Sequence, residues 1–280
     1  MSVSQLPPDA VQAWVIDELG VLLDRCGRER FLAAPLRLPT DEHFPDPWTA
    51  DLAGLESLLH RLLSYAGLDG LRLKLERFAG DRSIDHVDAR GEAVYRHHGA
   101  AAWFGGLDRR YAGADTAHFG CEERLLGEAG EALVGVLCHE VAHAFRHAHG
   151  LVRDHRDEEE QLTDLTTIYL GFGVLTVNNT HRYRTAMTGD MAAQRQWSKA
   201  GYLSPETMSF ALGAQLVARE LSCWQTWRTL RWLEPNQRGY TRAALRAVRP
   251  AESLWQRLAP PEPPVIDLGP SSSSNRPPTD

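Results

Sequence analysis

The segment HEVAHAFRH at residues 139–147 constrains the fold more strongly than any other part of the sequence. Residues four apart on an α-helix lie on one face, so His139 and His143 can direct their imidazoles at a single metal ion. Glu140 is rotated about 100° round the helix from His139 and lies beside this pair. Apolar residues flank the pattern: Val136, Leu137, Val141, Ala142, Ala144 and Phe145. We therefore expect a buried helix whose histidines bind a metal ion or, as the alternative, find hydrogen-bond partners in the core.

A third ligand is needed, because catalytic zinc takes three protein ligands and keeps one position for water. The acidic run that follows in the chain offers Glu158, Glu159, Glu160 and Asp164. Glu160 and Asp164 are four residues apart, so Glu160 can ligate the ion while Asp164 accepts a hydrogen bond from a ligating histidine. Glu159 is the reserve ligand. In the alternative interpretation, Glu160 forms a helix-capping box with Asp157, which leaves the spacing to Asp164 unexplained.

HEVAH at 139–143 followed by EQLTD at 160–164 resembles the gluzincins, the thermolysin-like zinc metallopeptidases. Their pattern is H-E-x-x-H with a downstream glutamate in an E-x-x-x-D helix, and the short link between the two motifs here is similar to that of minimal members. The resemblance covers roughly residues 70–175 and is more specific for zinc than for peptide hydrolysis. Residues 1–65 and 176–260 match no gluzincin.

The resemblance implies one Zn²⁺ per chain, with His139, His143 and Glu160 as metal ligands and Asp164 hydrogen-bonded behind them. It implies a zinc metallopeptidase that hydrolyses peptide bonds, in which Glu140 is the catalytic base for a zinc-bound water. A peptide or protein is then the substrate, and the sequence does not indicate its identity.

The hydrophobic pattern predicts an α+β fold: a zincin-like core with a small, mostly antiparallel sheet, an active-site helix and a glutamate helix, plus further helices at both ends. The expected strands are 71–78, 92–97, 101–107 and 117–122. The expected helices are 10–26, 50–66, 127–149, 158–177 and 205–227, with a last helix from about Thr241 to just before Pro250. The expected divisions are an N-terminal helical region (1–66), a metallopeptidase core (67–180), a C-terminal helical region (181–258) and a disordered Pro/Ser-rich tail (259–280).

Composition and charge indicate the cellular compartment and the classes of partner to expect. The chain of 280 residues has a formal net charge of −7, which argues against nucleic acid as a partner, and it has no apolar run long enough to span a membrane. Four cysteines without a C-x-x-C pair and an N-terminus without a signal-peptide pattern indicate a cytoplasmic protein. The oligomeric state is left open.

Further residues have less specific roles. Candidates for stabilising a transition-state oxyanion are Tyr169, His181, Tyr183 and Tyr202, among which the sequence does not choose. His147 and His149 are expected near the exposed end of the helix. Cys121 is a minor candidate for an inhibitory zinc ligand.

Two alternatives to an active peptidase are open. The first is a catalytically inactive, zinc-stabilised regulatory or protein-interaction module, although such a site has no use for Glu140. The second is a DNA-associated regulator that uses the arginines between Arg228 and Arg249, which otherwise form a solvated helical face.

Overall fold

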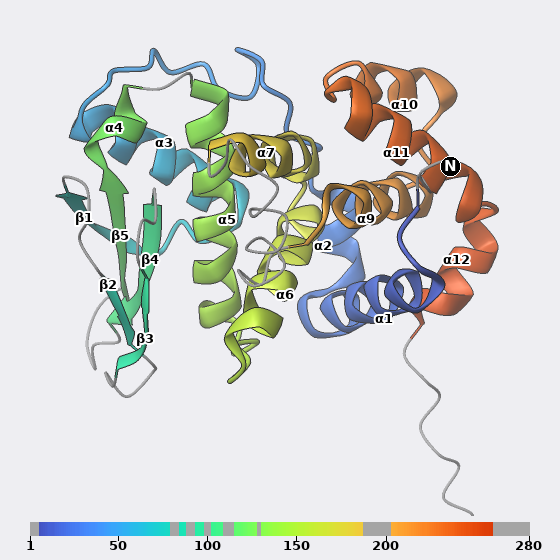
Figure 1. Cartoon of the computed structure of the whole chain (residues 1–280), viewed down its shortest axis with the longest axis horizontal. Coiled ribbons are helices and arrows are strands. Elements are labelled where there is room, and N and C mark those ends of the chain that lie inside the picture. The colour runs from blue at the N-terminus through green and yellow to red at the C-terminus, as the bar shows by residue number, and fades with distance from the viewer. Residues whose placement is uncertain are drawn as a thin grey trace, which may run out of the picture.

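The computed structural model describes residues 6–78, 84–87, 93–97, 102–108, 115–127, 130–186 and 203–259. A small β-sheet lies along one side of the molecule, and a long helix, α5 (Gly130–Ala148), packs against it (Figure 1). Further helices cover the opposite side of α5, so this helix lies between the sheet and the helical part of the chain. The predicted α+β fold is confirmed.

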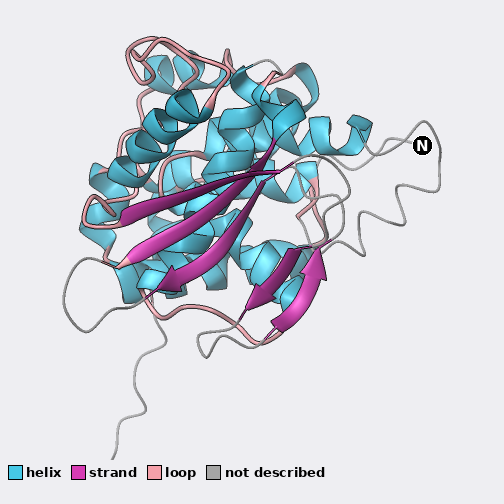
Figure 2. Cartoon of the chain, turned by 90° about the vertical axis from the view of Figure 1, so that its left-hand side faces the viewer, coloured by secondary structure: helices cyan, strands magenta, loops and turns pink. Residues whose placement is uncertain are grey.

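The strands lie in two groups, which Figure 2 shows in front of the helices. β1 (Arg72–Phe78), β5 (Thr116–Glu122) and β4 (Ala102–Asp108) form a sheet in the order β1-β5-β4, while β2 (Ile84–Val87) and β3 (Ala93–His97) form a separate antiparallel pair. β5 pairs with β1 in parallel and with β4 antiparallel, so the three-stranded sheet is mixed rather than mostly antiparallel. The four predicted strands are all present, and β2 was not predicted.

The first helices agree with the apolar periodicity. α1 (Asp9–Cys26) ends at Gly27, whose φ of 97° is accessible to glycine, and α3 (Leu52–Tyr65) is capped by the Asp51 carboxylate, which accepts a hydrogen bond from the Gly54 amide. The sequence pattern did not predict two short helices, α2 (Arg28–Ala33) and α4 (Glu123–Leu126).

Two predicted long helices are wrong, because each is divided in the structure. The segment 158–177 forms α6 (Arg156–Tyr169) and α7 (Gly173–Ala186), which are separated at Gly171, with a φ of 87°. A side chain at Gly171 would also collide with the chain at Pro35, because its Cβ atom would lie only 2.5 Å from the Pro35 carbonyl oxygen. The segment 205–227 forms α9 (Pro205–Ala218) and the start of α10 (Cys223–Leu230), which begins at a capping box between Ser222 and Gln225.

The C-terminal helices also differ from the prediction. α11 (Pro235–Ala247) begins six residues before Thr241, with proline in its first turn, and α12 (Ala251–Leu258) follows Pro250. The predicted disordered tail lies outside the described residues from position 260 onward.

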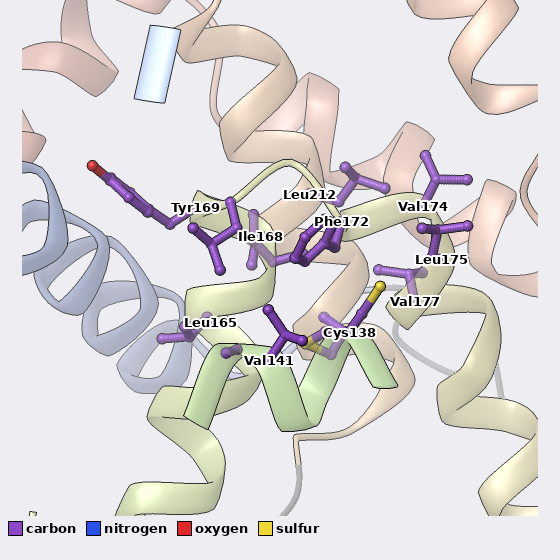
Figure 3. Close-up of a cluster of buried hydrophobic side chains, with 14 of the residues drawn as sticks. Cys138, Val141, Leu165, Ile168, Tyr169, Phe172, Val174, Leu175, Val177 and Leu212 are labelled. Atoms are coloured by element: carbon purple, nitrogen blue, oxygen red, sulfur yellow. The ribbon is translucent and has the colours of Figure 1, made fainter. Parts of the chain in front are cut away.

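One buried apolar cluster includes side chains from the N-terminal helices, the sheet, α5 to α7 and the C-terminal helices. Figure 3 shows the part of it around Cys138 and Val141 of α5, which face Leu165 and Ile168 of α6 together with α7 residues. This packing fixes the relative positions of α5 and α6, and therefore of the polar residues on the remaining faces of these two helices. None of the described helices is long and apolar enough to cross a membrane.

Candidate metal centre

The two histidines of the HEVAH segment lie side by side on α5. His139 is 5% exposed and His143 is 8% exposed, and their ring centroids are 4.8 Å apart. One turn of helix separates the residues, and the apolar neighbours that bury α5 remove both imidazoles from bulk water. Buried imidazoles require polar partners, so the surrounding contacts determine what this pair can do.

Glu160 of α6 is the residue on which both histidines converge. Its Oε2 atom lies 3.1 Å from Nε2 of His139 and 3.4 Å from Nε2 of His143, and Glu160 itself is 2% exposed. The three side chains form a group whose ligand atoms all lie within 4.8 Å of one another. Neighbouring ligand atoms around a tetrahedral zinc ion are about 3.4 Å apart, from metal–ligand distances of about 2.1 Å. The group therefore has the spacing and the donor atoms to hold a metal ion.

The rear nitrogen of each histidine is occupied by a different partner. Nδ1 of His139 donates to Oδ1 of Asp164 at 2.9 Å, and Nδ1 of His143 lies 3.1 Å from Oγ1 of Thr163. The second carboxylate oxygen of Asp164 accepts a hydrogen bond from the Leu203 amide at 2.9 Å. These contacts fix both rings with Nε2 towards Glu160, as metal-binding histidines require.

Sequence reasoning singled out Asp164 as a hydrogen-bond partner but missed Thr163 and Leu203. Thr163 lies three residues after Glu160, on the same side of α6, so helical spacing could have indicated it. Leu203 acts through its backbone amide and follows a segment outside the described residues, so no side-chain pattern could have indicated it.

The charges of the centre favour a cation between Glu160 and the two histidines. Burial raises the pKa of Glu160, but the nearby His143 and His139 outweigh this effect and hold its pKa well below the ordinary value. Burial lowers the pKa of His139, but hydrogen bonds to Asp164 and Glu160 outweigh it and hold that pKa well above the ordinary value. The Glu160 carboxylate therefore remains charged and stabilises positive charge in the site, which a proton on His139 or a metal dication can supply.

Glu140 lies beside the histidines and is 8% exposed. Burial raises its pKa, while the charges of His143 and His139 and a backbone hydrogen bond from Phe104 lower it. Phe104 belongs to β4, at the edge of the three-stranded sheet, so Glu140 connects α5 with this edge strand. The arrangement places a carboxylate with a raised pKa next to the potential ligands.

Glu159, the reserve ligand, is engaged elsewhere. Arg146 donates from Nε and Nη2 to its two carboxylate oxygens, at 2.7 and 2.8 Å, and the Arg153 amide donates to the same carboxylate at 2.9 Å. The capping alternative also fails, because α6 begins after His155 and shows no side-chain cap hydrogen bond. Of the two neighbouring glutamates, Glu160 is the one that faces the histidines.

The remaining candidates are not brought into the centre by the described contacts. The Tyr169 hydroxyl donates to the Gly27 carbonyl oxygen at 2.8 Å, which directs it towards α1. His181 and Tyr183 lie on α7 with side chains outside the described set, and Tyr202 lies outside the described residues.

The two histidines at the end of α5 and the thiol on β5 have other surroundings. His147 is half-buried against the Phe104 ring, with centroids 5.1 Å apart, and exposed His149 stacks on Phe145. Burial raises the pKa of the Cys121 thiol to about 12, so it is protonated at neutral pH and is a poor metal ligand in that form.

In comparisons with known proteins, no family model, no curated protein and no solved structure matches this chain.

Proposed function

We propose that this chain is a zinc-dependent metallopeptidase in which Glu140 is the catalytic base. The observation that carries the proposal is the convergence of three buried ligand atoms, from His139, His143 and Glu160, beside the carboxylate of Glu140, which is not one of the ligands. The resemblance of the HEVAH and EQLTD segments to the gluzincins supports the same assignment.

Zinc is the metal proposed because two imidazoles and one carboxylate form a common donor set of catalytic zinc sites. When bound, zinc supplies a Lewis acid that polarises a carbonyl and lowers the pKa of water towards neutrality. The group contains three ligands among the described residues, which leaves a tetrahedral ion one position for water or substrate. One zinc ion per chain follows from this arrangement.

The role proposed for Glu140 is proton transfer. Its carboxylate takes a proton from the attacking water and delivers it to the leaving amine of the cleaved peptide. Burial raises the pKa of Glu140, which brings a carboxylate closer to the operating pH of a general base. The Phe104 amide donates a hydrogen bond to Glu140 and holds this carboxylate between α5 and β4.

β4 is the proposed binding strand for an extended peptide substrate. It is an edge strand of the three-stranded sheet and packs against α5, so a peptide paired with its outer edge would pass close to Glu140. Its regular pairing with β5 is interrupted between Phe104 and Leu107, where Gly106 has a φ of 106°. A bulge at this position changes the direction of the strand close to the proposed base.

The burial of the ligands favours one second candidate, a zinc-stabilised module without catalytic activity. His139, His143 and Glu160 are all at most 8% exposed, and structural sites are typically closed to solvent. The glutamate at position 140 favours the peptidase, because a structural site needs no base.

Replacing Glu140 by Gln separates the two candidates. The zinc-loaded wild-type chain is incubated with a quenched fluorescent peptide mixture, and the Glu140→Gln variant is assayed at the same zinc content. The peptidase account predicts that the variant binds zinc normally and loses hydrolysis, while Glu158→Gln, a change to an exposed carboxylate beside Arg153, keeps zinc and activity. Equal hydrolysis by wild type and Glu140→Gln would overturn the catalytic role; absence of hydrolysis in both would favour the structural module.

A further inference from the structure

The exposed face of α10 carries two large apolar side chains. α10 buries Thr226, Thr229 and Leu230 against the rest of the molecule, whereas Trp224 is 61% exposed and Trp227 is 56% exposed. These two indoles are more exposed than any other large hydrophobic side chain in the described part of the chain. Surface helices ordinarily bury their apolar side and expose the polar one, so exposure of both tryptophans needs a reason.

Two exposed arginines lie on the same side of α10 as the two tryptophans. Helical spacing relates all four exposed residues: Trp224, Trp227, Arg228 and Arg231. We term this side of the helix the α10 face. The Arg228 guanidinium lies over the Trp224 ring at 5.5 Å from its centroid, and that of Arg231 lies over the Trp227 ring at 5.6 Å. These cation–π contacts order the long arginine side chains beside the indoles.

The helix is fixed at both ends, so the tryptophans are not exposed through loose attachment of α10. Ser222 and Gln225 form a complete capping box at its N-terminus. Arg238 donates to the carbonyl oxygens of Leu230, Arg231 and Leu233 at its C-terminal end. The Asn178 side-chain amide donates a hydrogen bond to the Trp232 carbonyl oxygen and accepts one from the Glu234 backbone amide. These two bonds hold the turn after α10 against α7. The α10 face is a preformed surface.

The charge around this face differs in sign from that of the whole chain. Residues 219–249 contain seven arginines and two glutamates, a net charge of +5, in a chain whose formal net charge is −7. A carboxylate already approaches the face, because Glu42 lies 3.5 Å from Arg228. Tryptophan and arginine are also the residues that contribute most often to binding hot spots between proteins.

We propose that the α10 face is a docking surface for an acidic protein segment that carries apolar side chains. The indoles would receive the apolar side chains, and Arg228 and Arg231 would pair with the carboxylates. A partner of that chemistry is complementary to both the indoles and the guanidinium groups of the α10 face. A nucleic acid would extend beyond the two arginines of this face and meet a chain whose formal net charge is −7, which disfavours it as the partner. The proposal is independent of the metal centre.

The test is fluorescence anisotropy with a labelled synthetic peptide of repeated Glu-Leu-Leu-Glu units. The protein is the full chain with Glu140→Gln, so that the probe stays intact. The test variants are Trp224→Ser with Trp227→Ser, and Arg228→Glu with Arg231→Glu. The matched control is Arg242→Glu with Arg246→Glu, which reverses two exposed charges on α11. We expect each test pair to weaken binding by about tenfold or more, and the control to change it less than about threefold.

Three outcomes would overturn the proposal. The first is no measurable binding of the acidic peptide. The second is equal binding of a peptide in which lysine replaces every glutamate, because this result would show that charge complementarity does not contribute to binding. The third is tighter binding of a single-stranded oligothymidine that depends on the same tryptophans and arginines, which would make the face a nucleic-acid surface. Circular dichroism of each variant shows that lost binding does not come from unfolding.

Discussion

Replacing Asp164 by Asn perturbs the metal centre without removing a ligand. Both carboxylate oxygens of Asp164 accept hydrogen bonds, one from His139 and the other from the Leu203 amide, each at 2.9 Å. An asparagine offers one oxygen acceptor, and its amide nitrogen is a donor, so one of these two donors must face another donor. The change also removes the negative charge that orients His139.

The magnitude follows from the type of hydrogen bond lost. A hydrogen bond to a charged group contributes about 1.5–3 kcal/mol, and loss of such a partner behind a metal-binding histidine lowers metal affinity about 10- to 100-fold. Asp164 is 7% exposed, so water does not readily replace the lost contact. We expect a decrease near the middle of that range, about 30-fold, or about 2 kcal/mol.

The affinity is measured by competition between the protein and a chromophoric zinc chelator at fixed pH. The increase in melting temperature on adding zinc provides a second measurement, because a ligand that binds only the folded chain stabilises it according to its affinity. Glu158→Gln is the matched control, since this exposed carboxylate in the same helical turn lies beside Arg153 rather than beside the histidines. An Asp164→Asn variant that folds and binds zinc within about twofold of wild type would refute the reasoning.

Three further predictions follow from other contacts. Thr163→Val should lower zinc affinity about tenfold while Thr163→Ser restores it, because Oγ1 of Thr163 orients His143; chelator competition tests this. Arg146→Met should destabilise the fold by about 3–5 kcal/mol in urea unfolding, because it leaves the buried Glu159 carboxylate unpaired, and Arg146→Met with Glu159→Leu should recover much of the loss. Burial raises the pKa of Tyr169 to about 12, so the unfolded chain loses the hydroxyl proton at a lower pH than the folded chain does. The free energy of unfolding should therefore fall between about pH 10 and pH 12. Tyr169→Phe should show a smaller fall. If the free energy of unfolding falls equally with pH in wild type and in Tyr169→Phe, the role assigned to Tyr169 would be contradicted.

The ligand cluster could be predicted because helical spacing is a local property. His139 and His143 must share a face of any helix that contains them, and the same rule relates Glu160 to Asp164. Both helices also carry apolar residues that pack them together, so the sequence indicated which polar residues would meet. The spacing to Asp164 favoured Glu160 over Glu159, and the structure adds a second reason, the contact of Glu159 with Arg146, which arises only when α5 and α6 pack.

The helix boundaries were harder to predict because apolar periodicity continues across the breaks. The segment 158–177 reads as one apolar helix, yet Gly171 takes a left-handed conformation beside the Pro35 carbonyl. That contact joins residues far apart in the chain, and no local pattern indicates it. The start of α11 is different, because Pro235 is a helix-start signal of the kind that Pro205 provides for α9, and the pattern could have indicated it.

The α10 face shows another limit of pattern reading. The sequence pattern placed Trp224 and Trp227 at the end of one predicted helix, 205–227, and no local signal indicated that both side chains would be exposed. In the structure, the capping box at Ser222 starts a new helix, and its orientation turns both indoles outward. The orientation is set by contacts of Arg238 and Asn178, which only the folded chain brings together.

The metal content of the purified chain tests the central claim most directly. We expect elemental analysis to find about one zinc ion per wild-type chain and about the same in Glu159→Gln, with little zinc in Glu160→Gln and His139→Ala. The neighbouring glutamates are chemically identical and differ only in whether they face the histidines or Arg146. A wild-type chain that remains metal-free after incubation with excess zinc, or a Glu160→Gln variant that retains full zinc content, would contradict the assignment of the centre.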